Sequence, residues 1–123
     1  MDTIDRQIIG HLQGDGRMSF ADLGRLIGLS PPATAERVRR LEDQGVIAGT
    51  RAMVNPSAIG LQILAFITLK TSGEHYQKVH QLSRDLDQVL ECHHVAGPDS
   101  FIIKAVVATV ADLEALIAEF RPY

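Results

Sequence analysis

Residues 19–45 read SFADLGRLIGLSPPATAERVRRLEDQG, and this stretch predicts two short helices joined by a tight turn. Ser19 is a typical helix N-cap, and Gly28 suits the residue that ends the first helix. Ser30 offers a second N-cap, and two prolines follow it where a helix has no intrahelical partner for the backbone N–H. The second helix is therefore expected to begin here and to end before Gly45.

The second predicted helix has one apolar face and one charged face. Thr34, Val38 and Leu41 recur at helical spacing on one side. The opposite side carries Glu36, Arg37, Arg39 and Arg40. An arginine fork can bond guanine O6 and N7 together or grip a phosphate, and a helix-turn-helix presents such a face to the major groove. An Arg-rich face that is merely solvated is the alternative, but the paired caps and the short turn favour DNA binding.

The residues expected to contact DNA lie at the start of this helix, along its charged face and just beyond it. They are Ser30, Pro32, Ala33, Glu36, Arg37, Arg39, Arg40 and Arg51. Those near the helix start can touch bases, while the arginines would carry affinity. Arg51 is a candidate phosphate contact, although a solvated strand residue is an equal alternative.

The flanking sequence predicts the rest of a DNA-binding domain. A helix is expected from residue 2 or 3 to Gln13, followed by a glycine-containing loop, so that three helices form one unit. Residues 46–47 and 51–54 predict a short two-stranded wing. Turn residues in 55–60 predict a linker, which gives a winged helix-turn-helix domain at residues 1–54 and a second domain at residues 61–123.

Composition limits the possible functions. The chain has 123 residues, of which 46% are hydrophobic, and a net charge of −3. Residues 1–60 carry seven Lys and Arg against seven Asp and Glu, so any positive field must be local. A single cysteine, Cys92, fits a reducing cytoplasm. No signal peptide is recognisable, and no apolar run is long enough to cross a bilayer, so no membrane association is expected.

The second domain shows the element order β-α-β-β-α. Strands are expected at residues 61–71, 89–96 and 100–108, and helices at residues 74–86 and from Thr109 onward. This order is a ferredoxin-like split βαβ without its fourth strand, so the whole chain is of the α+β class. Both helices of such a domain cover one face of the sheet. The bare face is therefore expected to be covered by self-association.

Two long segments resemble one known family. DTIDRQIIGHLQGDGRMSFADLGRLIGLS and ERVRRLEDQGVIAGTRAMVNPSAIG resemble the winged helix-turn-helix of the Lrp/AsnC family, the leucine-responsive and feast/famine regulators of bacteria and archaea. HHVAGPDSFIIKAVVA resembles the second half of that family's ligand-sensing domain, called RAM. The resemblance implies a sequence-specific transcriptional regulator that forms homodimers, often assembled into tetramers or octamers. It also implies an amino acid or similar small metabolite as effector, bound near the interfaces between sensing domains, and no cofactor.

A glycine loop in the second domain is the candidate effector site. Its residues are Gly97, Pro98, Asp99 and Ser100. Many relatives have Gly-x-x-Asp-aromatic here, whereas this chain places Asp99 one position earlier and Ser100 where the Asp stands. A carboxylate beside backbone N–H groups suits a free amino acid, although Gly-Pro-Asp is also a good turn on its own. Relatives continue with a strand that lies beside the first strand, so residues 61–71 are expected to form an apolar edge.

Two other classes of protein are weaker alternatives. Cys92, His93 and His94, with His75 and His80, suggest a metal-sensing regulator, since thiolate and imidazole ligate zinc or copper. On a strand, however, Cys92 and His94 share a face while His93 points away, and two histidines five apart do not meet on a helix. We therefore expect no metal site. An enzyme is not expected either, because no nucleophile, base and acid are suitably placed and no phosphate-binding loop is present.

Overall fold

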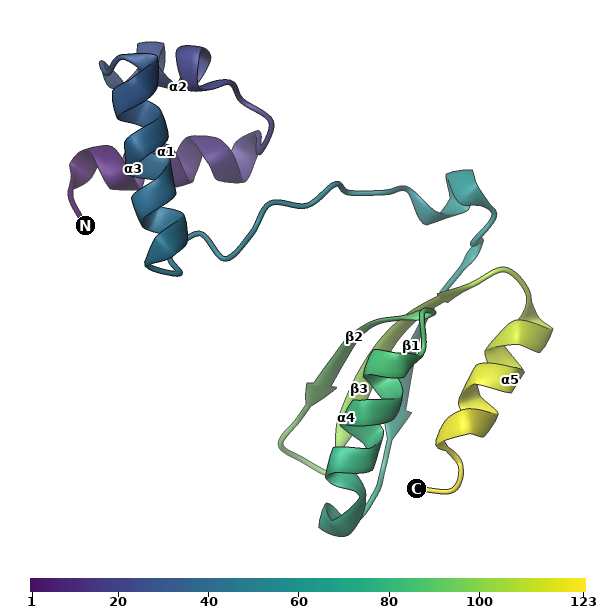
Figure 1. Cartoon of the computed structure of the whole chain (residues 1–123). Helices are drawn as coiled ribbons and strands as arrows, with labels where there is room; N and C mark the ends of the chain where they lie inside the picture. The colour runs from purple at the N-terminus through teal and green to yellow at the C-terminus, as the bar shows by residue number, and fades with distance from the viewer. The chain divides into compact units, whose positions relative to one another are not determined.

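The structure is a computed structural model that describes residues 1–123. The chain divides into two compact units, Met1–Met53 and Val54–Tyr123, which are distinct in Figure 1. Each unit has its own cluster of buried side chains. None of the helices is long and apolar enough to cross a membrane.

The first unit contains three helices, α1 (Thr3–Gly14), α2 (Phe20–Ile27) and α3 (Pro31–Asp43). Local capping sets their bounds, as the sequence predicted: the Ser19 hydroxyl accepts from the Asp22 N–H, and the Ser30 hydroxyl accepts from the Ala33 N–H. Gly28 ends α2 in the left-handed conformation with φ +77°. The helices enclose a core of Ile8, Leu23, Ile27, Val38 and Leu41.

The predicted two-stranded wing is wrong for this structure. No strand lies between α3 and residue 62. The N–H groups of Val46 and Ile47 instead both donate to the Leu41 carbonyl at the end of α3, at 2.9 and 3.1 Å. Because the end of the helix uses these donors, they are not available for pairing with residues 51–54.

The second unit has the predicted β-α-β-β-α order. Its elements are β1 (Ile63–Leu69), α4 (Tyr76–Asp85), β2 (Val89–His94), β3 (Phe101–Val107) and α5 (Val110–Phe120), with 3-10 turns at Pro56–Ile59 and Gly73–His75. The strands form an antiparallel sheet in the order β1-β3-β2. The first 3-10 turn lies in the predicted linker and ends at Gly60. The edge position of β1 agrees with the expected open edge.

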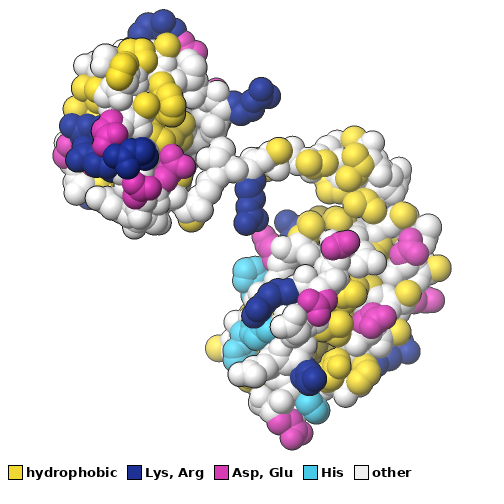
Figure 2. Space-filling view, viewed as in Figure 1, with side chains coloured by type: hydrophobic (Ala, Val, Ile, Leu, Met, Phe, Trp, Pro, Cys, Tyr) yellow, Lys and Arg dark blue, Asp and Glu magenta, His cyan; other side chains and the backbone are white.

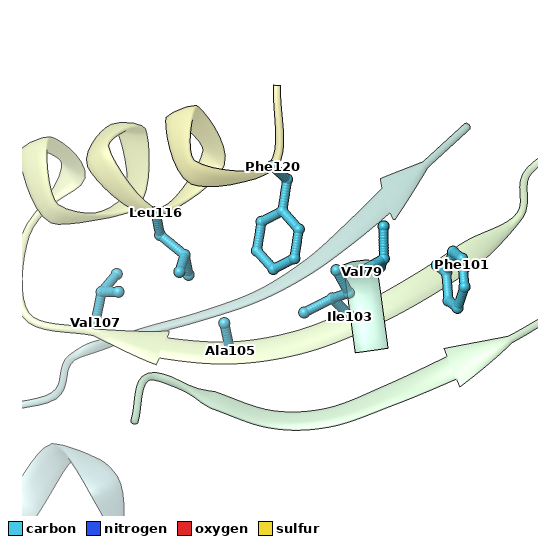
Figure 3. Close-up of a cluster of buried hydrophobic side chains, with 7 residues drawn as sticks. All are labelled: Val79, Phe101, Ile103, Ala105, Val107, Leu116 and Phe120. Atoms are coloured by element: carbon cyan, nitrogen blue, oxygen red, sulfur yellow. The ribbon is translucent and has the colours of Figure 1, made fainter. Parts of the chain in front are cut away.

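Both helices pack on one face of this sheet. Figure 3 shows Val79 from α4 and Leu116 and Phe120 from α5 beside four side chains of the central strand β3. The opposite face lacks such a cover: Leu64, Phe66 and Leu90 are all more than half exposed. In the register of the sheet, Leu64 lies across from Val106 and Phe66 across from Lys104.

Candidate nucleic-acid interface

The start of α3 is open to solvent and firmly braced. Thr34 is fully buried, and its hydroxyl donates to the Ser30 carbonyl at 2.9 Å. Of the predicted base contacts, Ser30, Pro32, Ala33 and Glu36 are all exposed. The structure therefore leaves this part of α3 accessible to a duplex.

Gly24 in α2 permits the close approach of the two helices. A Cβ at this position would lie 2.4 Å from the Leu29 carbonyl oxygen and 2.9 Å from the Thr34 hydroxyl oxygen. Only glycine fits such a contact without a shift of the turn. This role of Gly24 was not predicted from the sequence, although an isolated glycine inside a helix is a signal for a packing role.

Arg37 does not lie on the open face of α3 where the sequence analysis placed it. Its Nη1 lies 2.5 Å from Oδ2 of Asp2 and 3.3 Å from Oδ1 of Asp5, both at the start of α1. Its side chain is 23% exposed, against 60% for that of Arg39. The Arg37 guanidinium, helped by the Asp5 N–H, holds the pKa of the Asp2 carboxyl below its usual value.

Arg39 is exposed but paired along its own helix. Its guanidinium donates to both oxygens of Glu36 and, at 2.9 Å, to Oδ2 of Asp43. The hydrogen bond from Arg39 lowers the pKa of Glu36. A phosphate contact by Arg39 would have to share the guanidinium with these carboxylates.

Arg40 and Arg51 are the predicted contacts that remain unpaired. Both are exposed, and neither forms an ion pair. Figure 2 shows Lys and Arg side chains directly beside Asp and Glu side chains over the first unit. The positive charge that no ion pair neutralises is therefore carried by individual arginines of the first unit, Arg40 and Arg51 among them.

The glycine loop of the second unit combines a structural tie with an accessible acid. Gly97 has φ +126°, and Asp99 is half-buried. Ser100 is buried; its hydroxyl accepts from the Thr71 N–H at 3.2 Å and donates to the Thr71 carbonyl at 2.9 Å. Ser100 thus joins the start of β3 to the chain after β1, while no hydrogen bond engages the Asp99 carboxylate.

Two of the four histidines of the second unit, His80 and His94, pack against the ring of Phe101. His94 stacks on Phe101 with a centroid distance of 5.0 Å, and His80 meets the same ring edge-on at 5.1 Å. No group of three His, Cys, Asp or Glu side chains could hold a metal ion. The metal-sensing alternative therefore finds no support.

Each of the two units matches a known domain family. Residues 1–42 match the AsnC-type helix-turn-helix domain, and residues 64–122 match the Lrp/AsnC ligand binding domain. The HTH-type transcriptional regulator YezC of Bacillus subtilis is 41% identical over 118 residues, which cover 95% of this chain and 83% of that protein. The leucine-responsive regulatory protein of Escherichia coli is 34% identical over 122 residues, covering 97% and 74% of the two chains.

A solved structure has the same fold throughout. LrpC of B. subtilis matches with a TM-score of 0.90 and 31% identity. The match covers 100% of this chain and 88% of LrpC.

Proposed function

The chain belongs to the Lrp/AsnC family of DNA-binding transcriptional regulators, and we propose that it acts in the cytoplasm as paired copies whose α3 helices bind a specific DNA sequence. The family consists of regulators and not of enzymes. The observation that carries the proposal is the exposed start of α3, braced from behind by the buried Thr34 and by Gly24. Two such helices would enter successive major grooves about one turn of DNA apart.

In this proposal the predicted DNA-contacting residues have different roles. Ser30, Pro32, Ala33 and Glu36 are near enough to the helix start to face base edges. Arg40 and Arg51 are the better phosphate contacts, because neither has an intramolecular partner. Arg39 would contribute only by sharing its guanidinium with Glu36 and Asp43.

Selection of duplexes from a random DNA library tests sequence-specific binding. We expect enrichment of an inverted repeat whose half-sites are separated by about 10 base pairs, the spacing of successive major grooves. Failure to enrich any sequence over the starting library would refute specific recognition.

The pairing of chains rests on the bare face of the sheet. Leu64, Phe66 and Leu90 expose apolar surface there, and water-exposed apolar patches of this kind favour association. A second copy is a suitable cover because the same patch then serves both partners. Further assembly into tetramers or octamers would follow from additional contacts between such pairs.

The effector is proposed to be an amino acid or related small metabolite bound beside residues 97–100, where sensing domains meet. The Asp99 carboxylate would accept hydrogen bonds from the ammonium group of the effector, and backbone N–H groups of the loop would donate hydrogen bonds to the effector carboxylate. Ser100 would hold the loop in shape through Thr71. Effector binding would change the spacing or the number of associated pairs, because it favours one arrangement over another.

Thermal unfolding with each of the common amino acids tests the effector proposal. At least one amino acid should raise the Tm of the wild-type chain but not of Asp99→Asn. Asp87→Asn is the matched control, since Asp87 is exposed and lies in the same unit. The proposal fails if no amino acid shifts the Tm, or if Asp99→Asn responds like the wild type.

A further inference from the structure

The start of α1 holds Arg37 of α3 in a closed network of hydrogen bonds. Asp2 is the N-cap of α1 and Asp5 is the third helical residue, and the two form a capping box. We propose that Arg37 is a positioning residue that sets the orientation of α3 for DNA reading and does not itself contact DNA. The acids Asp2 and Asp5 then belong to the recognition machinery, although they lie on another helix. The inference rests on the proposed DNA-binding function.

Every carboxylate oxygen of the acid pair has a partner. Oδ1 of Asp2 accepts from the Asp5 N–H at 2.8 Å, and Oδ2 accepts from Arg37. Oδ2 of Asp5 accepts from the Asp2 N–H at 3.3 Å, and Oδ1 accepts from Arg37 at 3.3 Å. The capping box thus fixes both acids in place before they receive the guanidinium, which makes the contact geometrically specific.

This polar tie complements the apolar core between the same helices. Ile8 of α1 and Leu41 of α3 belong to one buried cluster, which holds the helices together. Apolar contacts are not directional, so they tolerate small rotations and shifts of one helix on another. Charge-assisted hydrogen bonds are directional and can define one orientation of α3.

The surroundings of Arg37 also disfavour a phosphate contact. Two carboxylates face one guanidinium, so the local charge of the cluster is −1 if all three groups are ionised. A DNA phosphate approaching Arg37 would meet these acids and would have to break both ion pairs. Arg40 lies three residues further along α3 and has no such partner, so the two arginines form a natural comparison.

The dependence of binding on salt separates a phosphate contact from a positioning role. Each phosphate neutralised by a cationic side chain adds about 0.9 to the slope of log affinity against log salt concentration. We would measure this slope by fluorescence anisotropy with the selected duplex and with a random duplex, for the wild type, Arg37→Gln and Arg40→Gln. Circular dichroism confirms that each variant is folded at the temperature used.

The proposal predicts opposite results for the two arginines. Arg40→Gln should lower the salt slope by about 0.9 per bound chain while preserving the preference for the selected duplex. Arg37→Gln should leave the slope unchanged and reduce that preference roughly tenfold, since a displaced helix loses about one base contact. A slope that falls as much in Arg37→Gln as in Arg40→Gln would overturn the proposal.

For substitutions of Asp2 and Asp5, the proposal predicts an effect on DNA binding opposite to the one expected from charge alone. Removing negative charge near DNA should strengthen binding to every duplex if Asp2 and Asp5 are bystanders. The proposal instead requires the Asp2→Asn and Asp5→Asn double variant to lose sequence preference as Arg37→Gln does. Stronger binding with preference unchanged would contradict it.

A second readout remains decisive if the wild type prefers no duplex, a result that would refute the proposed function. Hydrogen exchange of the Asp5 amide, which donates to the Asp2 carboxylate, should then be faster in Arg37→Gln than in the wild type, and unchanged in Arg40→Gln, because only Arg37 is tied to the capping box. Equal exchange rates in the wild type and Arg37→Gln would show that the tie does not constrain the helices.

Discussion

Arg37, Arg39 and Arg40 lie within about one turn of α3 and have three different surroundings. Arg37 is enclosed by two acids of α1, Arg39 is paired with acids of its own helix, and Arg40 is unpaired. Their formal charges are equal, but the field that each offers to a phosphate is not. The ion-pair partners of each arginine, more than its residue type, therefore decide what charge it offers to a phosphate.

The lowered pKa of Asp2 predicts an acid-dependent loss of stability. The usual pKa of this carboxyl is 3.8, and the hydrogen bond from Arg37 lowers it in the folded chain. The stabilising contribution is thus fully present above pH 3.8 and is lost as the pH falls through the lower, folded-state value. We expect the Tm difference between the wild type and Asp2→Asn to be constant above about pH 5 and to shrink below pH 3.8.

Glu42→Gln provides the control for this pH profile, because Glu42 is exposed in the same unit and forms no ion pair. Its Tm difference from the wild type should show no comparable decrease between pH 5 and 2.5 if the Asp2 contact is the cause. A pH-independent Tm difference for Asp2→Asn would show that Arg37 does not stabilise the folded chain through this carboxylate.

The bounds of helices, which depend on neighbouring residues, could be predicted from the sequence, whereas contacts between residues far apart in the chain could not. Helix caps act within about four residues, so Ser19 and Ser30 located α2 and α3 correctly. The partners of Arg37 lie 32 and 35 residues away, and those of Ser100 lie 29 residues away. No local sequence pattern encodes such contacts. The β-branched residues Val46 and Ile47 after α3 likewise suggested a strand, although their N–H groups cap the helix.

Replacement of glycine by alanine is predicted to have opposite effects at Gly24 in α2 and at Gly10 in α1. Gly24→Ala should lower the free energy of unfolding by about 1–3 kcal/mol, because its Cβ would meet the Leu29 carbonyl and the turn must shift. Gly10→Ala should raise that free energy by roughly 0.5–1 kcal/mol, because Gly10 lies inside α1 with open space around it.

Urea titration followed by the amide signals of α2 and α3 measures both variants. The second unit serves as an internal reference, because neither glycine belongs to it. A Gly24→Ala variant as stable as the wild type would show that the two helices do not need this close approach.

The uncovered sheet face is the candidate surface for association with a second copy of the chain. Phe66 is 65% exposed on that face, and a buried charge at an apolar contact is costly. Phe66→Asp should therefore convert a dimer to a folded monomer, as measured by sedimentation equilibrium. Val110→Asp is the matched control, because Val110 is equally apolar and exposed but lies at the start of α5.

An unchanged dimer in Phe66→Asp would exclude this face as the interface. Dissociation of both variants to the same extent would indicate a general effect of added charge. Loss of dimer in Phe66→Asp alone is the result that supports the proposed pairing.

Sequence-specific binding by the whole chain can be measured by fluorescence anisotropy with the DNA upstream of its own gene. The salt concentration would be varied from about 50 to 200 mM, the range in which phosphate contacts show most clearly. We predict saturable binding that is tighter than to random DNA and that weakens steeply as salt increases. Equal affinity for both duplexes at every salt concentration would contradict the proposal that this chain reads DNA sequence through α3.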